Sequence, residues 1–457
     1  MIKKYEPRLG LEHSKLFDVH RWSEYPEVNK FINKVFASLD FSEVGKDKTA
    51  KHNLKVVLLD LYVKWIEDPD LVTAFSRTHS DYKAKSRYNE LHISKKVIRV
   101  VDILESVGLL HQAKGFYNRG QNDGYPKGMG KLSRIWPSYA LREMFEECRI
   151  NPQTIANHPE RETVILRGRK RKLIEYEDNR ATRDMRSFLR RFNIFLQKSD
   201  ISHPRHGYRS SFTRCIFNRG HWDEGGRFYN DWQNITSKER SEFLLNGEPT
   251  VEIDYSAIHP YLLYAERGLE SPWTLMDVLF EDPYDHKDFS RAQMKTMFLV
   301  MLNCERESQA LRAYKDPVTG KRPLPFVETR PILEAIKEKH SEIRDAFCSD
   351  QGIKLMWKDA QIAKGVMERF LEANKPILPI HDSFVVQASQ AEFLKDAMYH
   401  SLREVVDDDA VLGPTGLPPI KVIMSDEARP YLPPGFASIG DSNEYTTVLR
   451  ILWPRVT

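Results

Sequence analysis

Two apolar runs of β-strand type each lead directly into an aspartate, and this pair of features constrains the fold more than any other. The first run, residues 251–253, alternates apolar and polar side chains and ends at Asp254, which predicts a strand with one buried face. The second, residues 377–386, is apolar on both sides of the central pair His381 and Asp382, which predicts a hairpin with Asp382 near its turn. Two such strand ends can bring two carboxylates together.

Paired carboxylates are typical ligands of Mg²⁺ or Mn²⁺. Two such ions bridging Asp254 and Asp382 would lower the pKa of an attacking 3′-hydroxyl and stabilise the charge on a leaving pyrophosphate. The backbone carbonyl of Tyr255 is a further candidate ligand. An aspartate that ends a strand is more often a turn residue than a ligand, so the order and spacing of the surrounding motifs must decide between the two interpretations.

Three motifs together resemble the family A DNA polymerases and the related single-subunit, phage-type RNA polymerases. The segment from Asp254 to His259 is similar to their first palm motif, Asp-Tyr-Ser-Gln-Ile-Glu, and His381-Asp382-Ser383 is similar to the third, which reads His-Asp-Glu in the DNA enzymes and His-Asp-Ser in the RNA enzymes. Between them, Arg291 and Lys295 resemble the fingers motif Arg-x-x-x-Lys. This resemblance, over about residues 225–406, implies that the aspartates are metal ligands and that Arg291 and Lys295 bind the triphosphate and assist catalysis.

Departures from the family pattern fall on residues that choose the substrate. His259 stands where the DNA enzymes have a glutamate near the sugar 2′ position, and Asn303 stands where they have a tyrosine that tests the sugar and the base pair. The resemblance therefore implies that both residues contact the nucleotide, while the preferred sugar stays open.

The segment 225–235 resembles the family's Gly-Arg … Gln-Asn-Ile segment, which touches primer and template. This implies nucleic-acid contacts for Arg227 and Gln233, and the third palm motif implies one for His381. The alternative for segment 225–235 is a glycine turn followed by an aromatic core strand.

Charge is concentrated in one region. The chain has 457 residues and a formal net charge of only +4. Between Arg161 and Arg191, however, the sequence has eleven Lys or Arg and only five Asp or Glu. This stripe, which includes Arg169 and Arg171, is expected to bind phosphates, the alternative being a solvated helix face. No long apolar run or signal-type N-terminus is present, so we expect a cytoplasmic protein with no membrane partner.

The N-terminal third carries a different pattern. Residues 94–110 predict an amphipathic helix with Ser94 as its N-cap, followed by a strand over 109–114, a turn-rich tip and a return strand over 131–136. A helix followed by a long basic hairpin is typical of a winged helix. In that case the DNA-facing side chains of the recognition helix would be Lys95, Lys96 and Arg99, and those of the wing would be Arg119, Lys127 and Lys131.

These observations predict an α+β protein in three parts. Residues 1–145 would form a helical and winged-helix domain, 146–224 a basic helical thumb or linker, and 225–457 a right-hand polymerase palm with an antiparallel sheet, backing helices and inserted helical fingers. The expected function is template-directed nucleotidyl transfer by a DNA polymerase of a mobile element. Its partners would be a DNA primer-template, nucleoside triphosphates and replication proteins, with RNA as an alternative template. Other interpretations are a non-catalytic replication initiator with a degenerate palm, an RNA-synthesising, primase-like enzyme, and a two-metal nuclease.

Overall fold

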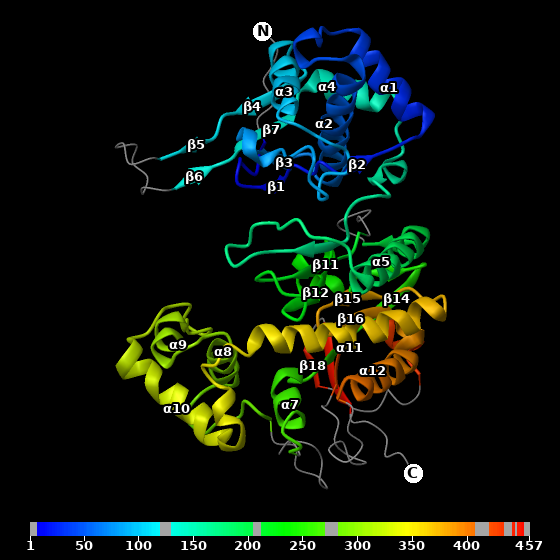
Figure 1. Ribbon diagram of the computed structural model, residues 1–457. Coiled ribbons are helices and arrows are strands. Elements are labelled where there is room, and N and C mark those ends of the chain that lie inside the picture. The colour runs from blue at the N-terminus through cyan, green and yellow to red at the C-terminus, as the bar shows by residue number, and fades with distance from the viewer. Residues whose placement is uncertain are drawn as a thin grey trace. The chain divides into compact units, whose positions relative to one another are not determined.

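The computed structural model is a mixed α+β structure and describes residues 7–118, 129–203, 212–269, 282–406, 420–433, 441–443 and 446–451 (Figure 1). The chain divides into two compact units, the first formed by Met1–Glu162 and the second mainly by Thr163–Arg205 and Ser211–Thr457. No helix among the described residues combines the length and apolar character needed to cross a membrane.

The first unit combines helices with a small sheet. Its strand order is β1-β3-β7-β4, with β1 parallel to β3 and the other neighbours antiparallel. The short pair β5 and β6 continues the hairpin of β4 and β7 as a projecting arm (Figure 1). A separate pair joins β2 to β8. The strands are β1 (Ser14–Leu16), β2 (Arg21–Trp22), β3 (Val72–Phe75), β4 (Leu110–Ala113), β5 (Phe116–Tyr117), β6 (Gly130–Lys131), β7 (Ser133–Pro137) and β8 (Ala156–Asn157).

Apolar faces of the helices form the core of this unit. Helix α3 buries Val97, Val100, Val101 and Leu104, as its spacing predicts, against α2. Its N-cap is Lys95 rather than the expected Ser94, whose Oγ instead accepts a long hydrogen bond of 3.4 Å from the Lys96 N–H. The helices are α1 (Pro26–Ala37), α2 (Asp47–Glu67), α3 (Lys96–Ser106) and α4 (Tyr139–Glu147).

The second unit is built on an eight-stranded sheet. Strand β14 lies at its centre, with β16 and β17 antiparallel to it on either side, and β15 forms a tight hairpin with β16. The strands are β10 (Ile201–Ser202), β13 (Leu244–Leu245), β14 (Glu248–Tyr255), β15 (Leu378–Ile380), β16 (Ser383–Gln387), β17 (Ile420–Met424), β18 (Asp441–Asn443) and β19 (Thr446–Ile451). A second sheet has the order β12-β11-β9, formed by β9 (Val164–Leu166), β11 (Arg214–Phe217) and β12 (Gly225–Tyr229).

Helices cover the large sheet. The long stretch of sequence between β14 and β15 forms the helices α7 to α11. Helix α12 packs on β14 and β16, and α11 packs on α12, α7 and β12, so that α11 runs through the middle of the unit (Figure 1). Helices α8, α9 and α10 form a separate lobe of the same unit. The helices are α5 (Arg180–Lys198), α6 (Ser237–Arg240), α7 (Ile258–Ala265), α8 (Arg291–Leu302), α9 (Glu307–Ala313), α10 (Arg330–Lys339), α11 (Gly352–Glu372) and α12 (Ala391–Val406).

The boundaries of the units differ from those expected at residues 145 and 224. The basic segment expected as a separate middle part is divided at Glu162, and its larger, C-terminal portion belongs to the second unit. The physical reason is the apolar face of α5, whose Phe188, Leu189 and Phe192 are part of the same buried core as β14 and α11. A helix that buries this much apolar surface in a neighbouring core cannot act as an independent linker.

Candidate active site

Asp254 and Asp382 lie next to each other at one end of the large sheet. In the pairing of β14 with β16, Asp254 stands opposite Ser383, and Asp382 occupies the turn that joins β15 to β16. The backbone N–H of Tyr255 donates to the backbone carbonyl of Asp382 at 3.3 Å, which ties the two segments together. Residues 128 positions apart in the sequence are thus neighbours in space, as the two apolar runs predict.

The electrostatics of this pair suit a cation. Burial, and then the nearby Asp382, raise the pKa of Asp254 well above its usual value, while Lys295 and Lys421 act in the opposite direction. Both aspartates are partly exposed to solvent, and within the described part of the chain neither carboxylate accepts a hydrogen bond or forms an ion pair. Two carboxylates that repel each other and have free oxygens are a donor set that fits Mg²⁺ or Mn²⁺.

The segments around the two aspartates adopt unusual backbone conformations. His381 has φ +60° and Ala257, the residue before α7, has φ +64°, both in the left-handed region that is costly for non-glycine residues. The Tyr255 hydroxyl donates to the Met398 carbonyl at 2.6 Å, which fixes the end of β14 onto α12. Tyr255 is therefore a structural anchor through its side chain, and its backbone carbonyl stays a candidate ligand.

His381 lies beside the aspartates with one ring nitrogen unused. Its ring packs edge-on against Tyr229 with 5.4 Å between centroids, and its Nδ1 is buried with no hydrogen-bond partner among the described residues. Burial and the nearby Arg227 lower the pKa of His381, so the neutral imidazole is favoured.

Helix α8 presents the two expected cations on one face. Ser290 and Gln293 form a capping box that fixes the start of the helix. The Arg291 guanidinium donates to Asp282 at 2.6 Å and lies over the Tyr284 ring, with its Cζ 5.3 Å from the centroid. Lys295, one turn further on, is exposed and lies close enough to Asp254 to lower its pKa. Arg291 is thus held by a protein partner, whereas Lys295 lies near Asp254.

A buried charge cluster joins three elements behind this site. Asp359 of α11 accepts hydrogen bonds from Arg227 of β12, one of them Nε at 3.0 Å, and from His259 of α7, at Nε2, 2.8 Å away. The Asp359 side chain is 1% exposed and the Arg227 side chain 15%. Arg227 and His259, in turn, hold the pKa of Asp359 below its usual value against the opposing effect of burial.

This cluster changes the roles expected for two residues. Arg227 was predicted to contact nucleic acid, but its guanidinium is engaged by Asp359 inside the protein. His259 is buried, and its Nε2 is directed at the same carboxylate. Asp359 was missed in the sequence, although a carboxylate within the buried stripe of α11, between Leu355 and Ile362, is a signal that could have found it.

A second buried ion pair supports the turn that carries Asp382. Arg240 donates to both oxygens of Glu252 at 2.9 and 2.7 Å, and the Ser383 hydroxyl donates to the same carboxylate at 2.9 Å. Glu252 lies on the same face of β14 as Asp254, because alternate residues of a strand share a face. The serine that follows Asp382 is thus anchored to the strand that carries Asp254.

Two other expected contact residues are engaged in local structure. The Gln233 amide donates to the Phe228 carbonyl at 2.6 Å, closing the turn after β12, and Phe228 and Trp232 are buried. Asn303 terminates α8 and donates to the Leu299 carbonyl at 2.8 Å. These contacts correspond to the aromatic core strand that was the alternative for segment 225–235, and to a helix end at Asn303.

The expected DNA-binding cations of the first unit lie on its surface. Lys95 and Lys96 are exposed at the start of α3, while Arg99 forms an exposed ion pair with Glu43. On the wing, Lys131 pairs with Glu12 at 2.6 Å, and Arg119 and Lys127 lie outside the described residues.

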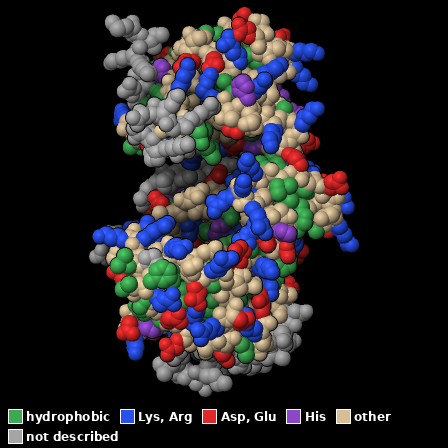
Figure 2. Space-filling view, turned by 60° about the vertical axis from the view of Figure 1, so that its left-hand side comes forward, with side chains coloured by type: hydrophobic (Ala, Val, Ile, Leu, Met, Phe, Trp, Pro, Cys, Tyr) green, Lys and Arg blue, Asp and Glu red, His purple; other side chains and the backbone are tan. Residues whose placement is uncertain are grey.

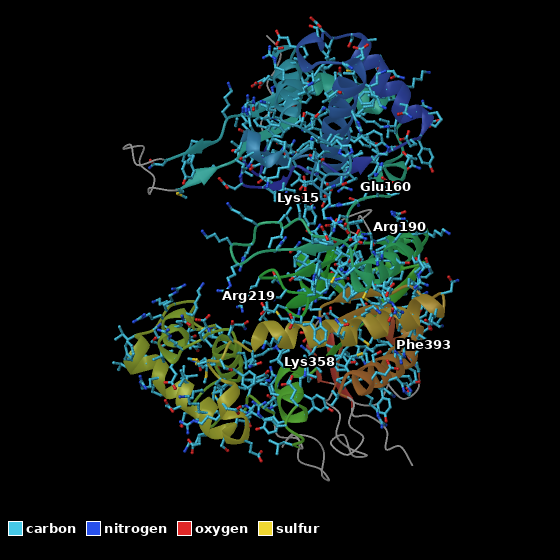
Figure 3. The ribbon with its side chains drawn as sticks, in the orientation of Figure 1. Lys15, Glu160, Arg190, Arg219, Lys358 and Phe393 are labelled. Carbon is cyan, nitrogen blue, oxygen red and sulfur yellow. The ribbon has the colours of Figure 1, made fainter. Side chains whose placement is uncertain are left out.

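The basic stripe of the second unit is likewise on its surface. Arg169 and Arg171 are exposed in the turn after β9, and Arg190 and Arg191 are exposed on α5 (Figure 3 labels Arg190). The buried face of α5 points the opposite way, into the core. These four cations of the stripe are therefore open to solvent, whereas Arg161 and Arg186 pair with Asp18 and Asp178.

No family model matches the chain, and no curated protein matches it significantly. Within the described residues, no group of three or more His, Cys, Asp or Glu side chains is arranged to hold a metal. The candidate site thus consists of a carboxylate pair, to which a bound substrate would have to add further oxygen ligands.

Proposed function

We propose that this protein is a template-directed nucleotidyltransferase, and that a DNA polymerase is its most fitting form. The observation that carries the proposal is the pair Asp254 and Asp382. The two are adjacent at the end of two antiparallel strands, they accept no hydrogen bond from described residues, and Lys295 lies near Asp254. A triphosphate bound here would add phosphate oxygens to the two carboxylates, as a two-cation mechanism requires.

The arrangement of elements supports the same proposal. An antiparallel sheet with its helices α11 and α12 on one side corresponds to a palm, and the α8–α10 lobe inserted between β14 and β15 corresponds to fingers. Both motifs that resemble palm motifs in sequence lie on neighbouring strands of this sheet.

The roles of the chain's own residues follow from their positions. Asp254 and Asp382 would hold two divalent cations, which when bound supply positive charge to the attacking hydroxyl and the leaving pyrophosphate. Lys295 would bind the triphosphate and donate a proton to the pyrophosphate, and Arg291 would bind phosphate after exchanging its partner Asp282. His259, held by Asp359, would lie near the sugar and influence the choice between deoxyribose and ribose.

The first unit supports recruitment to DNA. Along the chain its elements follow the order α2-β3-α3-β4-β7, and in the sheet β7 lies between β3 and β4. This arrangement is typical of a winged helix with α3 as the recognition helix. Lys95 and Lys96 have no ion-pair partner among the described residues and would contact duplex phosphates. An enzyme with such a module would bind an origin or start site, as expected for a polymerase of a mobile element.

Two alternatives rest on specific observations. Glu252 accepts hydrogen bonds from both Arg240 and Ser383, so among the described residues this carboxylate is not free beside the aspartates, as in a non-catalytic initiator with a degenerate palm. His259 and Asn303 depart from the DNA enzymes, as in an RNA-synthesising enzyme. The retained pair of partly buried aspartates favours catalysis, since unpaired carboxylates are costly to keep.

A primer-extension assay separates these functions. The protein is given a primed template with Mg²⁺ or Mn²⁺ and either dNTPs or NTPs, beside Asp254→Ala, Asp382→Ala and the control Asp396→Asn, an exposed aspartate of α12. We expect extension by the wild type and the control, and loss of roughly a thousandfold in the two site variants. Duplex binding without primer extension would instead support the non-catalytic replication initiator. Shortening of the primer would support a nuclease.

A further inference from the structure

Four exposed apolar side chains lie in the segment between α9 and α10 of the α8–α10 lobe. Val318 is 67% exposed, Leu324 62%, Phe326 55% and Val327 70%, and we call these four residues the tip patch. They fall within ten consecutive residues, between α9 and α10, and on this lobe Figure 2 shows hydrophobic side chains beside basic ones. Exposed apolar clusters of this kind mark binding surfaces, because single exposed apolar residues are common but groups are not.

The backbone that carries the tip patch is held by carboxylates. The Asp316 carboxylate accepts the N–H groups of Val318 and Thr319 at 2.8 and 2.9 Å and the Gln293 amide at 2.7 Å. The Glu328 carboxylate accepts the N–H of Leu324 at 2.7 Å. Gln293 lies on α8 between Arg291 and Lys295, so the loop is tied to the helix of the candidate active site.

These bonds engage the acidic groups of the tip and leave its cations free. Asp316 is 9% exposed, and its backbone and side-chain donors hold its pKa below the usual range. Lys315, Lys321 and Arg322 are exposed and form no ion pair with a described residue. The Arg330 guanidinium lies over the Phe326 ring, with Cζ 5.8 Å from its centroid. The segment 315–330 carries four Lys or Arg against two carboxylates, so the surface combines an accessible aromatic ring with a net positive charge.

We infer that the tip patch is a binding site for single-stranded nucleic acid. Phe326 would stack on a base, Leu324 and Val327 would pack beside it, and Lys321 and Arg322 would contact neighbouring phosphates. A duplex offers phosphates but keeps its base faces stacked, so an exposed ring is complementary to a single strand. The inference extends the proposed function, because the strand would be the unpaired template ahead of the active site.

Binding of a short fluorescent single-stranded DNA tests the site without catalysis, since neither nucleotides nor divalent cations are added. We expect Phe326→Ala to weaken binding roughly tenfold. The double variant Lys321→Glu/Arg322→Glu should also weaken binding and reduce its salt dependence. Tyr431→Ala, which removes a 49% exposed ring outside the tip patch, should leave binding unchanged. Unchanged affinity in both tip variants, with circular dichroism confirming that they fold, would overturn the inference.

Two further measurements identify the occupant. A single-stranded DNA carrying 5-iododeoxyuridine should cross-link on irradiation to the peptide that contains Phe326, and a cross-link map without this peptide would contradict the site. Equal weakening of blunt duplex binding by Phe326→Ala would contradict the preference for single strands. Tip-dependent self-association in sedimentation, without an effect on DNA binding, would assign the surface to a second copy of the chain. If the protein binds single-stranded DNA through Phe326 but does not extend a primer, the proposed function is refuted and the tip patch inference is not.

Discussion

Asp254 and Asp382 show how a functional requirement opposes stability at single residues. The raised pKa of Asp254 means that its charged form is disfavoured in the folded protein by burial and by Asp382. Such repulsion is retained only where a cation compensates for it, so the same two groups that would hold metal ions should weaken the fold when no ion is bound.

The first prediction concerns this repulsion. Asp254→Asn removes one charge from the pair and should raise the free energy of unfolding by up to about 1 kcal/mol in the presence of a chelator. Urea denaturation of the variant and the wild type measures the difference. Added Mg²⁺ or Mn²⁺ should stabilise the wild type and not the variant. A variant that is less stable than the wild type in chelator would show that the carboxylate is structurally required.

The second prediction concerns His340, which is fully buried in the α8–α10 lobe. Its Nε2–H donates to the Pro283 carbonyl at 3.0 Å, and burial lowers its pKa to about 4 from the ordinary 6.5. The unfolded chain therefore binds a proton that the folded chain does not, and stability present above pH 6.5 is lost as the pH falls toward 4. The loss should amount to roughly 3 kcal/mol.

Unfolding measured between pH 7 and pH 4 checks this expectation. His340→Gln keeps an N–H donor without a titrating ring and should lose part of the pH dependence. The exposed His221→Gln serves as the matched control and should keep all of it. Identical pH profiles for the wild type and His340→Gln would contradict the assignment.

At the scale of elements, Asp359 connects the long helix α11 to strand β12 and helix α7. Removing the partner of a buried charge is costly, since Arg227 would remain in the interior without its counter-ion. We predict that Asp359→Ala lowers the free energy of unfolding by about 3–5 kcal/mol. By contrast, Asp426→Ala, which breaks an exposed pair with Arg429, should cost less than about 1 kcal/mol.

A double variant separates the charge from the packing. Arg227→Met combined with Asp359→Leu removes both charges and should recover much of the stability lost in Asp359→Ala, as chemical denaturation would show. A double variant no more stable than Asp359→Ala would contradict the cost assigned to the unpaired Arg227 charge.

At the scale of the whole molecule, the two units have separate hydrophobic cores. We predict two unfolding transitions in calorimetry. Leu58→Ala in α2 should weaken one transition and Met367→Ala in α11 the other, each by about 2–5 kcal/mol, because both side chains are fully buried. A single transition that both variants shift equally would show that the units unfold as one.

The sequence predicted the elements that depend on local patterns. The strand ending at Asp254, the hairpin around Asp382, helix α3 and the hairpin after it were all expected, because alternation, helical spacing and turn residues act within a few positions. The order of the motifs also predicted the adjacency of the two aspartates.

Only the tertiary structure decided which polar side chains are free to act. Arg227 and Gln233 carry donors suited to nucleic acid, yet Asp359 and the Phe228 carbonyl already accept from them. The partner of Arg227 is 132 residues away along the chain. Hydrogen bonds and burial depend on neighbours that folding brings together, and such neighbours leave no periodic pattern in the sequence. For the same reason the sequence could identify the carboxylate pair, but not the buried charges that support it.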